Sequence, residues 1–372
     1  MTAHRPLPNF AAALLLASGS VPGYAAAPLP ALGADLQGLT VSGISSGGHM
    51  AVQFQVAHSR LVRGAGVLAA GPYDCAEGSL RHALERCLSP STHAPRSPLP
   101  PPAQISQRIE ALARAGQIDP AAHLRDDRVW LLSGGQDRTV ETPVMDALAA
   151  FYGEWLPADA IRYVKPADAG HAMISIADPQ ANACATSEAP FINRCGELDA
   201  AGELLGHLLG ELNAPAQAPV GEIVAFDQRP FVAGKAIDAS LADEGYAWLP
   251  QTCRNGGCRV HVVFHGCRQS AAELGQRFVK NAGYNAWADS NRLIVLYPQI
   301  VPRSGLAFGS WTWRYNPKGC WDWWGYTGND YLTRAGVQIR AVRAMIERLG
   351  AAPAATRAGT AAGKPPPPGK TP

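Results

Sequence analysis

Short apolar runs recur along the chain, and several of them are continuous instead of alternating with polar residues. Continuous runs of this kind are typical of strands that are buried on both faces of a sheet. The pattern predicts strands over residues 39–44, 64–70, 128–133, 161–165, 222–226, 246–249, 260–264 and 293–297.

Segments with apolar residues at helical spacing lie between many of these runs. They predict helices over residues 48–58, 104–115, 143–155, 198–212, 271–278 and 331–349. Alternation of strands and helices indicates an α/β fold with an open, mainly parallel sheet and helices on both faces. In such a sheet the active site lies at the carboxyl ends of the strands.

The two ends of the chain depart from this alternation. Residues 1–25 combine a weakly basic start, a short apolar stretch and a small-residue cleavage site after Ala25, which predicts a secretory signal peptide. A buried N-terminal helix is the alternative. Residues 351–372 are small and Pro-rich and predict a disordered tail. We therefore expect a single domain over residues 26–350.

Charge and hydropathy narrow the range of partners. The chain has 372 residues and a formal net charge of +2, so it presents no large basic field for nucleic acid. No stretch approaches the roughly 20 apolar residues that cross a bilayer. We expect a monomer that is secreted to the periplasm or the extracellular medium and that has neither a nucleic-acid nor a membrane partner.

The eight cysteines fit an oxidising compartment. None of them has the spacing of a zinc site, so we expect no metal. Pairing of sequence neighbours suggests Cys75–Cys87, Cys184–Cys195 and Cys253–Cys258, which leaves Cys267 with Cys320, although spacing alone keeps the connectivity open.

The strongest chemical motif is Gly43-Ile44-Ser45-Ser46-Gly47, which follows a predicted strand and precedes a predicted helix. In that context a G-x-S-x-G is typical of the nucleophile elbow, a strained turn that exposes the serine hydroxyl. The alternative is an ordinary glycine-rich turn in which Ser45 caps the helix. The context favours Ser45 as a nucleophile.

A serine nucleophile needs a base, and the base needs a group that orients it. Asp137 and His171 each follow a predicted strand, and the chain order serine, aspartate, histidine is that of the α/β-hydrolases. We therefore predict a triad of Ser45, Asp137 and His171. The other candidate acids are Asp168, which is more typical of a loop cap, and Asp74, Asp126 and Asp127.

A His-Gly pair that could introduce the second oxyanion donor occurs at His265-Gly266, far downstream of the serine. The strands that normally precede the triad therefore follow it, and the helix over 331–349 resembles one that leads into the elbow strand. A circular permutation explains this order. The alternative is two unrelated domains, with His265 in a structural role.

These motifs resemble the secreted poly(3-hydroxybutyrate) depolymerases that have a circularly permuted catalytic domain. The resemblance runs from about residue 36 to 350 and rests on GISSGGHMA (43–51), HGCRQS (265–270), NAGYNAWADSN (281–291), LYPQ (296–299) and NPKGCWDWWGYTGNDY (316–331). It implies a catalytic triad at Ser45, Asp137 and His171, an oxyanion hole formed by the amides of Ser46 and Cys267, and a substrate-binding tryptophan in the late aromatic segment.

Within that aromatic segment we expect Trp321 to contact the substrate, with core packing as the alternative. The expected reaction is hydrolysis of polyhydroxyalkanoate esters through an acyl-enzyme, without a cofactor. Two other functions are considered. One is a carboxylesterase acting on feruloyl or acetyl esters of plant walls; the other is a non-catalytic protein that binds a polymer surface.

Overall fold

Successive side chains of the central strands pack into two different hydrophobic cores. In β3 (Arg128–Leu132), Val129 and Leu131 belong to one core, whereas Trp130 and Leu132 belong to the other. Because neighbouring residues of a strand point to opposite faces, both faces of the sheet are covered.

The computed structural model describes residues 26–93, 98–308 and 311–353. The predicted signal peptide and residues 354–372 of the predicted tail lie outside the described residues. Within the described residues, no helix is long and apolar enough to cross a bilayer.

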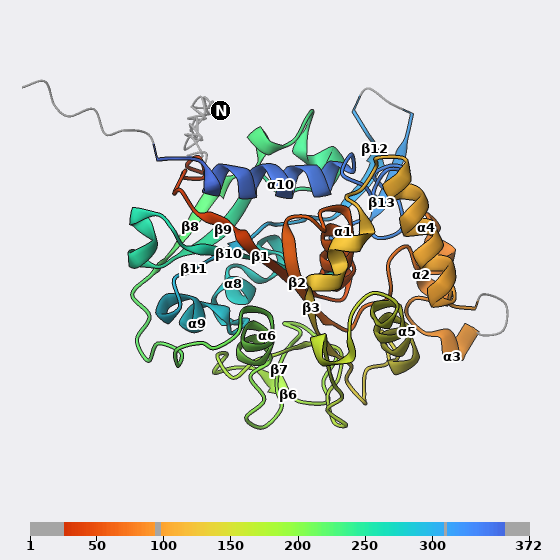
Figure 1. Cartoon of the computed structure of the whole chain (residues 1–372), viewed down its shortest axis with the longest axis horizontal. Coiled ribbons are helices and arrows are strands. Elements are labelled where there is room, and N and C mark those ends of the chain that lie inside the picture. Colours follow the sequence, from red (N-terminus) through yellow and green to blue (C-terminus); the bar gives the residue numbers. More distant parts are fainter. Residues whose placement is uncertain (1–25, 94–97, 309–310, 354–372) are drawn as a thin grey trace, which may run out of the picture.

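One eight-stranded sheet forms the centre of the molecule (Figure 1). All eight predicted strands occur in it. From edge to edge its members are β4 (Ile161–Val164), β3, β2 (Val62–Leu68), β1 (Asp35–Ile44), β10 (Arg259–Phe264), β11 (Leu293–Tyr297), β9 (Glu244–Leu249) and β8 (Glu222–Asp227). The strands from β4 to β11 are parallel, and β9 pairs antiparallel with both of its neighbours.

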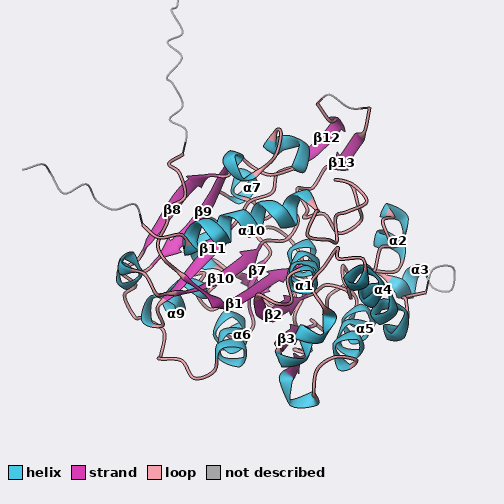
Figure 2. Ribbon diagram, turned by 45° about the horizontal axis from the view of Figure 1, so that its top comes forward, coloured by secondary structure: helices cyan, strands magenta, loops and turns pink. Residues whose placement is uncertain are grey.

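The helices lie on both faces of this sheet (Figure 2). One core receives α1 (Ser46–Ala57), α4 (Pro102–Arg114), α5 (Thr142–Gly153) and α10 (Val337–Gly350). The opposite core receives α6 (Ala200–Leu209), α8 (Arg277–Asn281) and α9 (Tyr284–Ser290).

Shorter elements surround this framework. They are α2 (Leu80–Glu85), α3 (Pro90–His93), α7 (Ala271–Leu274), a three-stranded sheet of β5 (Met173–Ile174), β7 (Ile192–Arg194) and β6 (Asn182–Ala183), and a hairpin of β12 (Arg303–Leu306) and β13 (Trp313–Asn316). Two helix predictions need correction. The helix expected over 271–278 is split into α7 and α8 at Gly275, whose φ of 58° is left-handed, and α10 begins at Val337 instead of residue 331.

The order of strands is that expected of a circular permutation. Strand β1, which is early in the chain, lies at the centre of the sheet between β2 and the late strand β10. The end of α10 adjoins the start of the described chain, because Leu349 accepts hydrogen bonds from the amides of Leu32 (3.1 Å) and Ala34 (3.0 Å) (Figure 1). Strands from the early and the late parts of the chain therefore belong to one continuous sheet.

Candidate active site

Ser45 lies on a sharp turn between β1 and α1. Its φ of 56° and ψ of −125° are strained for a residue that carries a side chain. The turn packs very closely against β10, since a Cβ added at Gly47 would lie 2.2 Å from the carbonyl oxygen of Phe264. Only glycine fits there, which explains why the elbow motif needs that residue.

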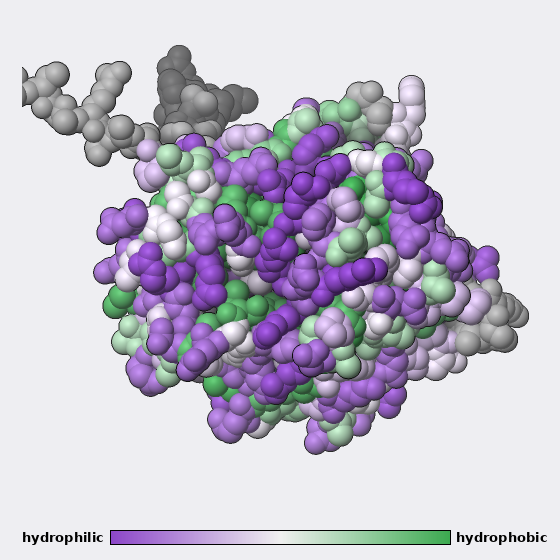
Figure 3. All heavy atoms as spheres, in the orientation of Figure 1, coloured by the Kyte–Doolittle hydropathy of each residue, from purple (hydrophilic) through white to green (hydrophobic). Residues whose placement is uncertain are grey.

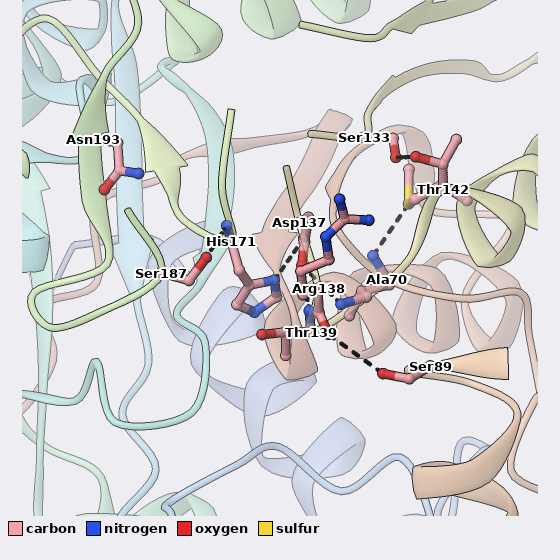
Figure 4. Close-up of polar contacts among 12 residues, drawn as sticks. Ala70, Ser89, Ser133, Asp137, Arg138, Thr139, Thr142, His171, Ser187 and Asn193 are labelled. Atoms are coloured by element: carbon pink, nitrogen blue, oxygen red, sulfur yellow. Dashed lines mark hydrogen bonds and ion pairs between the residues drawn. The ribbon is translucent and has the colours of Figure 1, made fainter. Parts of the chain in front are cut away.

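Asp137 and His171 lie together in the loops after β3 and β4 (Figure 4). His171 Nδ1 is 2.7 Å from Asp137 Oδ2, and the two side chains are 9% and 1% exposed. The other carboxylate oxygen, Oδ1, accepts the amides of Thr139 and Val140, each at 2.8 Å. The His171 amide donates to Ser187 Oγ at 2.8 Å. The carboxylate is therefore fixed, and it orients the imidazole so that Nε2 has no hydrogen-bond partner among the described residues.

The other candidate acids lie elsewhere. Asp168 is exposed, Asp74 accepts a hydrogen bond from the Tyr331 hydroxyl at 3.0 Å, and Asp127 accepts one from Gln55 Nε2 at 2.8 Å. None of these carboxylates contacts His171 within the part of the chain that the structure describes.

The loop after β10 brings Cys267 next to the serine. Ser45, His171, Gly266 and Cys267 all line one pocket. The Cys267 amide has no backbone acceptor among the described residues, and Ser46 is the first residue of α1, where amides lack intrahelical partners. Both amides are thus available to a developing oxyanion.

Two buried side chains hold this oxyanion loop in place. His265 donates from Nδ1 to the Gly266 carbonyl at 2.7 Å and accepts the Ile300 amide at Nε2 at 3.1 Å. Burial lowers the pKa of His265 to about 4, so it stays neutral and serves the loop structurally. Gln269 accepts the Gly266 amide at 2.8 Å and donates to the Phe191 carbonyl at 2.9 Å.

The pocket has a volume of about 390 Å³ and a largely apolar wall. Leucines and aromatic rings contribute to that wall, at Leu80, Leu84, Leu88, Phe191, Tyr315, Trp323 and Trp324. Such a wall suits an uncharged, largely apolar chain. Among the described residues, no group of three or more histidine, cysteine or acidic side chains is arranged to hold a metal ion.

Trp321 does not lie on this wall, which contradicts the expectation that it contacts the substrate. Its side chain is completely buried and packs edge-on against Phe264, with ring centroids 4.9 Å apart. The tryptophans that line the pocket are Trp323 and Trp324 instead. The packing alternative therefore describes Trp321 correctly.

The sequence did not predict a role for two residues that support the tryptophan segment, His49 and Asp322. His49, on α1, stacks on Trp323 with centroids 4.2 Å apart and planes 7° from parallel, and burial lowers its pKa to about 3. The Asp322 carboxylate accepts four consecutive backbone amides, of residues 324–327, at 2.7–3.2 Å. The position of Asp322 inside Trp-Asp-Trp-Trp is the signal that could have indicated a loop-organising carboxylate.

All eight cysteines are paired, in the combination that sequence neighbours suggested. The Cys267–Cys320 bridge, with an S–S distance of 2.05 Å, joins the oxyanion loop to the aromatic segment. The loop that carries Cys267 and the aromatic segment are therefore covalently connected.

Comparison with known proteins gives consistent results. No protein-family model matches the chain. The chain is 42% identical over 345 residues to the poly(3-hydroxybutyrate) depolymerase of Delftia acidovorans, covering 91% of this chain and 64% of that protein. It is 34% identical over 331 residues to the polyhydroxybutyrate depolymerase of Talaromyces funiculosus, covering 87% of this chain and 93% of that protein.

Solved structures agree with these relatives. The PHB depolymerase from Penicillium funiculosum superimposes with a TM-score of 0.77 and 32% identity, covering 87% of this chain and 100% of that one. A serine-to-alanine variant of a PHB depolymerase, complexed with an R3HB trimer, gives the same TM-score, identity and coverage.

Proposed function

The chain belongs to the poly(3-hydroxybutyrate) depolymerase family, and from this premise we propose that it hydrolyses the ester bonds of poly(3-hydroxybutyrate)-type polyesters. The observation that carries the proposal is the 2.7 Å contact of Asp137 with His171, which lines one pocket together with Ser45. The similarity to depolymerases favours a polyester over a feruloyl or acetyl ester of plant walls.

In the proposed mechanism, His171 Nε2 removes the Ser45 hydroxyl proton as the oxygen attacks the ester carbonyl. Asp137 stabilises the imidazolium that forms. The amides of Ser46 and Cys267 bind the negative oxygen of the tetrahedral intermediate. Transfer of the proton to the leaving alcohol breaks the C–O bond and leaves an acyl-enzyme. Water, deprotonated by His171, then releases the hydroxyacid and restores Ser45.

The molecular surface supports a solid apolar substrate. Hydrophilic residues predominate on the face shown in Figure 3. Five of the eight exposed large apolar side chains among the described residues lie on or between β12 and β13, at Leu306, Phe308, Trp311, Trp313 and Tyr315. Tyr315 also lines the pocket, so this hairpin would hold the pocket mouth near a polymer surface.

We also propose that the catalytic domain covers residues 26–350, that the protein acts as a monomer and that it is exported. The four disulfides support export to the periplasm or beyond, because such bonds persist in oxidising compartments.

The test is incubation of the protein and its Ser45→Ala variant with amorphous poly(3-hydroxybutyrate) and with a feruloyl ester. We expect soluble 3-hydroxybutyrate or its oligomers from the protein, no feruloyl turnover, and a loss on the order of 10⁴-fold or more in the variant at unchanged melting temperature. Activity retained by Ser45→Ala, or turnover of the feruloyl ester alone, would contradict the proposal.

A further inference from the structure

Two positively charged side chains line the pocket, although an interior ester of the polymer carries no charge for them to bind. Arg268 and Lys318 line the pocket, and no aspartate or glutamate does. Poly(3-hydroxybutyrate) is uncharged except for the carboxylate at one end of each chain. A cation therefore gains little from the interior of the polymer, whereas it would bind that end strongly.

The two cations are positioned directly beside the oxyanion loop. Arg268 follows Cys267 in the chain, and its amide donates to the Lys318 carbonyl at 2.9 Å. The Cys267–Cys320 disulfide joins the same two segments. The backbones that carry both cations are thus fixed to each other and to the proposed reaction centre.

Neither cation has an ion-pair partner among the residues that the structure describes. The ion pairs among the described residues involve other basic side chains, and none reaches Arg268 or Lys318. Glu273 is the carboxyl group that Arg268 influences; burial raises its pKa, and Arg268 partly offsets that rise without pairing with it. Both positive charges remain available to a ligand.

Arg268 also has an unfavourable backbone conformation. Its φ of 62° lies in the left-handed region, where glycine or asparagine would be accommodated at lower cost. Backbone strain of this kind gathers at functional sites. The strain therefore makes Arg268 a candidate for a functional residue beside the pocket.

We propose that Arg268 and Lys318 bind the terminal carboxylate of short hydroxyacid oligomers and so position their last ester bond at Ser45. This inference rests on the proposed function. Each hydrolysis adds water across one ester bond and releases a new carboxylate, so soluble products carry the charge that these residues recognise. In an oligomer the carboxylate lies on the alcohol side of the scissile bond, which is the half that leaves.

The test compares the linear 3-hydroxybutyrate trimer that has a free carboxylate with its methyl ester. We expect the protein to have a higher kcat/KM for the acid than for the methyl ester at low salt. In Arg268→Gln/Lys318→Gln the ratio of the two kcat/KM values should fall roughly tenfold. Raising the ionic strength should lower this ratio in the protein and have little effect on it in the double variant.

A matched control removes two exposed arginines elsewhere, in Arg60→Gln/Arg340→Gln, and should keep the original ratio. Arg268→Lys retains the charge and should keep most of the preference. A protein that cleaves acid and methyl ester equally well, or a double variant that keeps the ratio, would overturn the carboxylate site while leaving ester hydrolysis intact. Failure of the proposed function has another signature, which is that neither trimer is cleaved.

Discussion

Whether His171 can act as a base depends on which ring nitrogen carries its proton. An ionised Asp137 can only accept hydrogen bonds, so Nδ1 must donate and Nε2 is free. In Asp137→Asn the amide group can present N–H to Nδ1 and favour the wrong tautomer. We expect kcat on p-nitrophenyl butyrate to fall on the order of 10⁴-fold with little change in melting temperature.

The matched control for this change is Asp168→Asn, which alters an exposed carboxyl group in the same His171 loop and should retain activity. If Asp137→Asn remained nearly as active as the parent, another group would have to orient the imidazole.

Trp321 and Trp323 are two residues apart and should respond differently to replacement by alanine. Trp323 lines the pocket, so its loss should reduce polyester turnover by roughly 5- to 150-fold and affect p-nitrophenyl butyrate much less. Trp321 is completely buried, so its loss should lower the free energy of unfolding by roughly 3–5 kcal/mol and damage both activities alike. Turnover of both substrates and a denaturant titration of each variant measure these two effects. Equal losses on both substrates in Trp323→Ala would count against a substrate contact.

Asp127 makes the stability of the fold depend on pH. Burial raises the pKa of Asp127 from 3.8 to about 8, and its Oδ1 has no hydrogen-bond partner among the described residues. The folded state therefore retains a proton that the unfolded chain releases, so the stabilisation is complete below pH 3.8 and is lost as the pH rises to about 8.

Because the parent protein loses this stabilisation at high pH, we expect Asp127→Asn to melt at a higher temperature than the parent at pH 9. The difference should shrink towards pH 4. Thermal melting across that range measures it. Asp126→Asn, at the exposed neighbouring position, should show only a small part of this trend, because the Asp126 charge is a minor cause of the raised pKa of Asp127. A difference that is independent of pH would mean that Asp127 is ionised in the folded protein throughout.

At the scale of elements, the Cys267–Cys320 bridge and the Cys253–Cys258 bridge offer a direct comparison. Their sequence separations are 53 and 5 residues. Removal of the bridge that closes the longer loop should therefore lower the free energy of unfolding by about 4 kcal/mol, and removal of the other by about 2 kcal/mol. Alanine at both cysteines of each pair tests this by urea titration. Of the two double variants, only Cys267→Ala/Cys320→Ala should also lose ester turnover, because the Cys267–Cys320 bridge is the one that fixes the oxyanion loop.

The elements of the sheet could be predicted because their signal is local. Every predicted strand is a short, mostly apolar run; the inner strands are largely buried, and the edge strands β4 and β8 are mostly half-buried. The two-residue strands such as β5 and β6 are too short to produce a pattern. The roles of the tryptophans could not be predicted in the same way. Trp321, Trp323 and Trp324 are chemically alike and adjacent, and only tertiary packing decides which of them faces the core and which the pocket.

At the scale of the whole molecule, the predicted permutation connects the triad with the late strands. The downstream position of His265-Gly266 indicates it, since the oxyanion loop must lie beside the serine although more than two hundred residues separate them in sequence. The parallel pairing of β1 with β10, in which Gly43 lies opposite Phe264, places the two segments side by side. What the sequence leaves open is the packing at the pocket, where His49 and Asp322 support the wall.

The permuted order itself can be tested by reversing it. Gly33 donates to Ala351 at 2.8 Å, so the start and end of the described chain already lie together (Figure 1). A flexible linker of roughly ten residues should span from Pro353 to Ala26. New ends opened between the exposed residues Gln217 and Ala218, in the connection from α6 to β8, break no strand or helix of the structure. Because every element of the sheet keeps its neighbours, we expect this variant to fold, to melt within about 4–8 °C of the parent and to retain ester turnover within several-fold.

A control opened inside β10, between Val262 and Val263, interrupts the strand that leads to the oxyanion loop and should not fold. Circular dichroism and p-nitrophenyl butyrate turnover distinguish the two. If the first variant failed to fold while its linker was varied in length, the proximity of the two ends would not be sufficient to reverse the order.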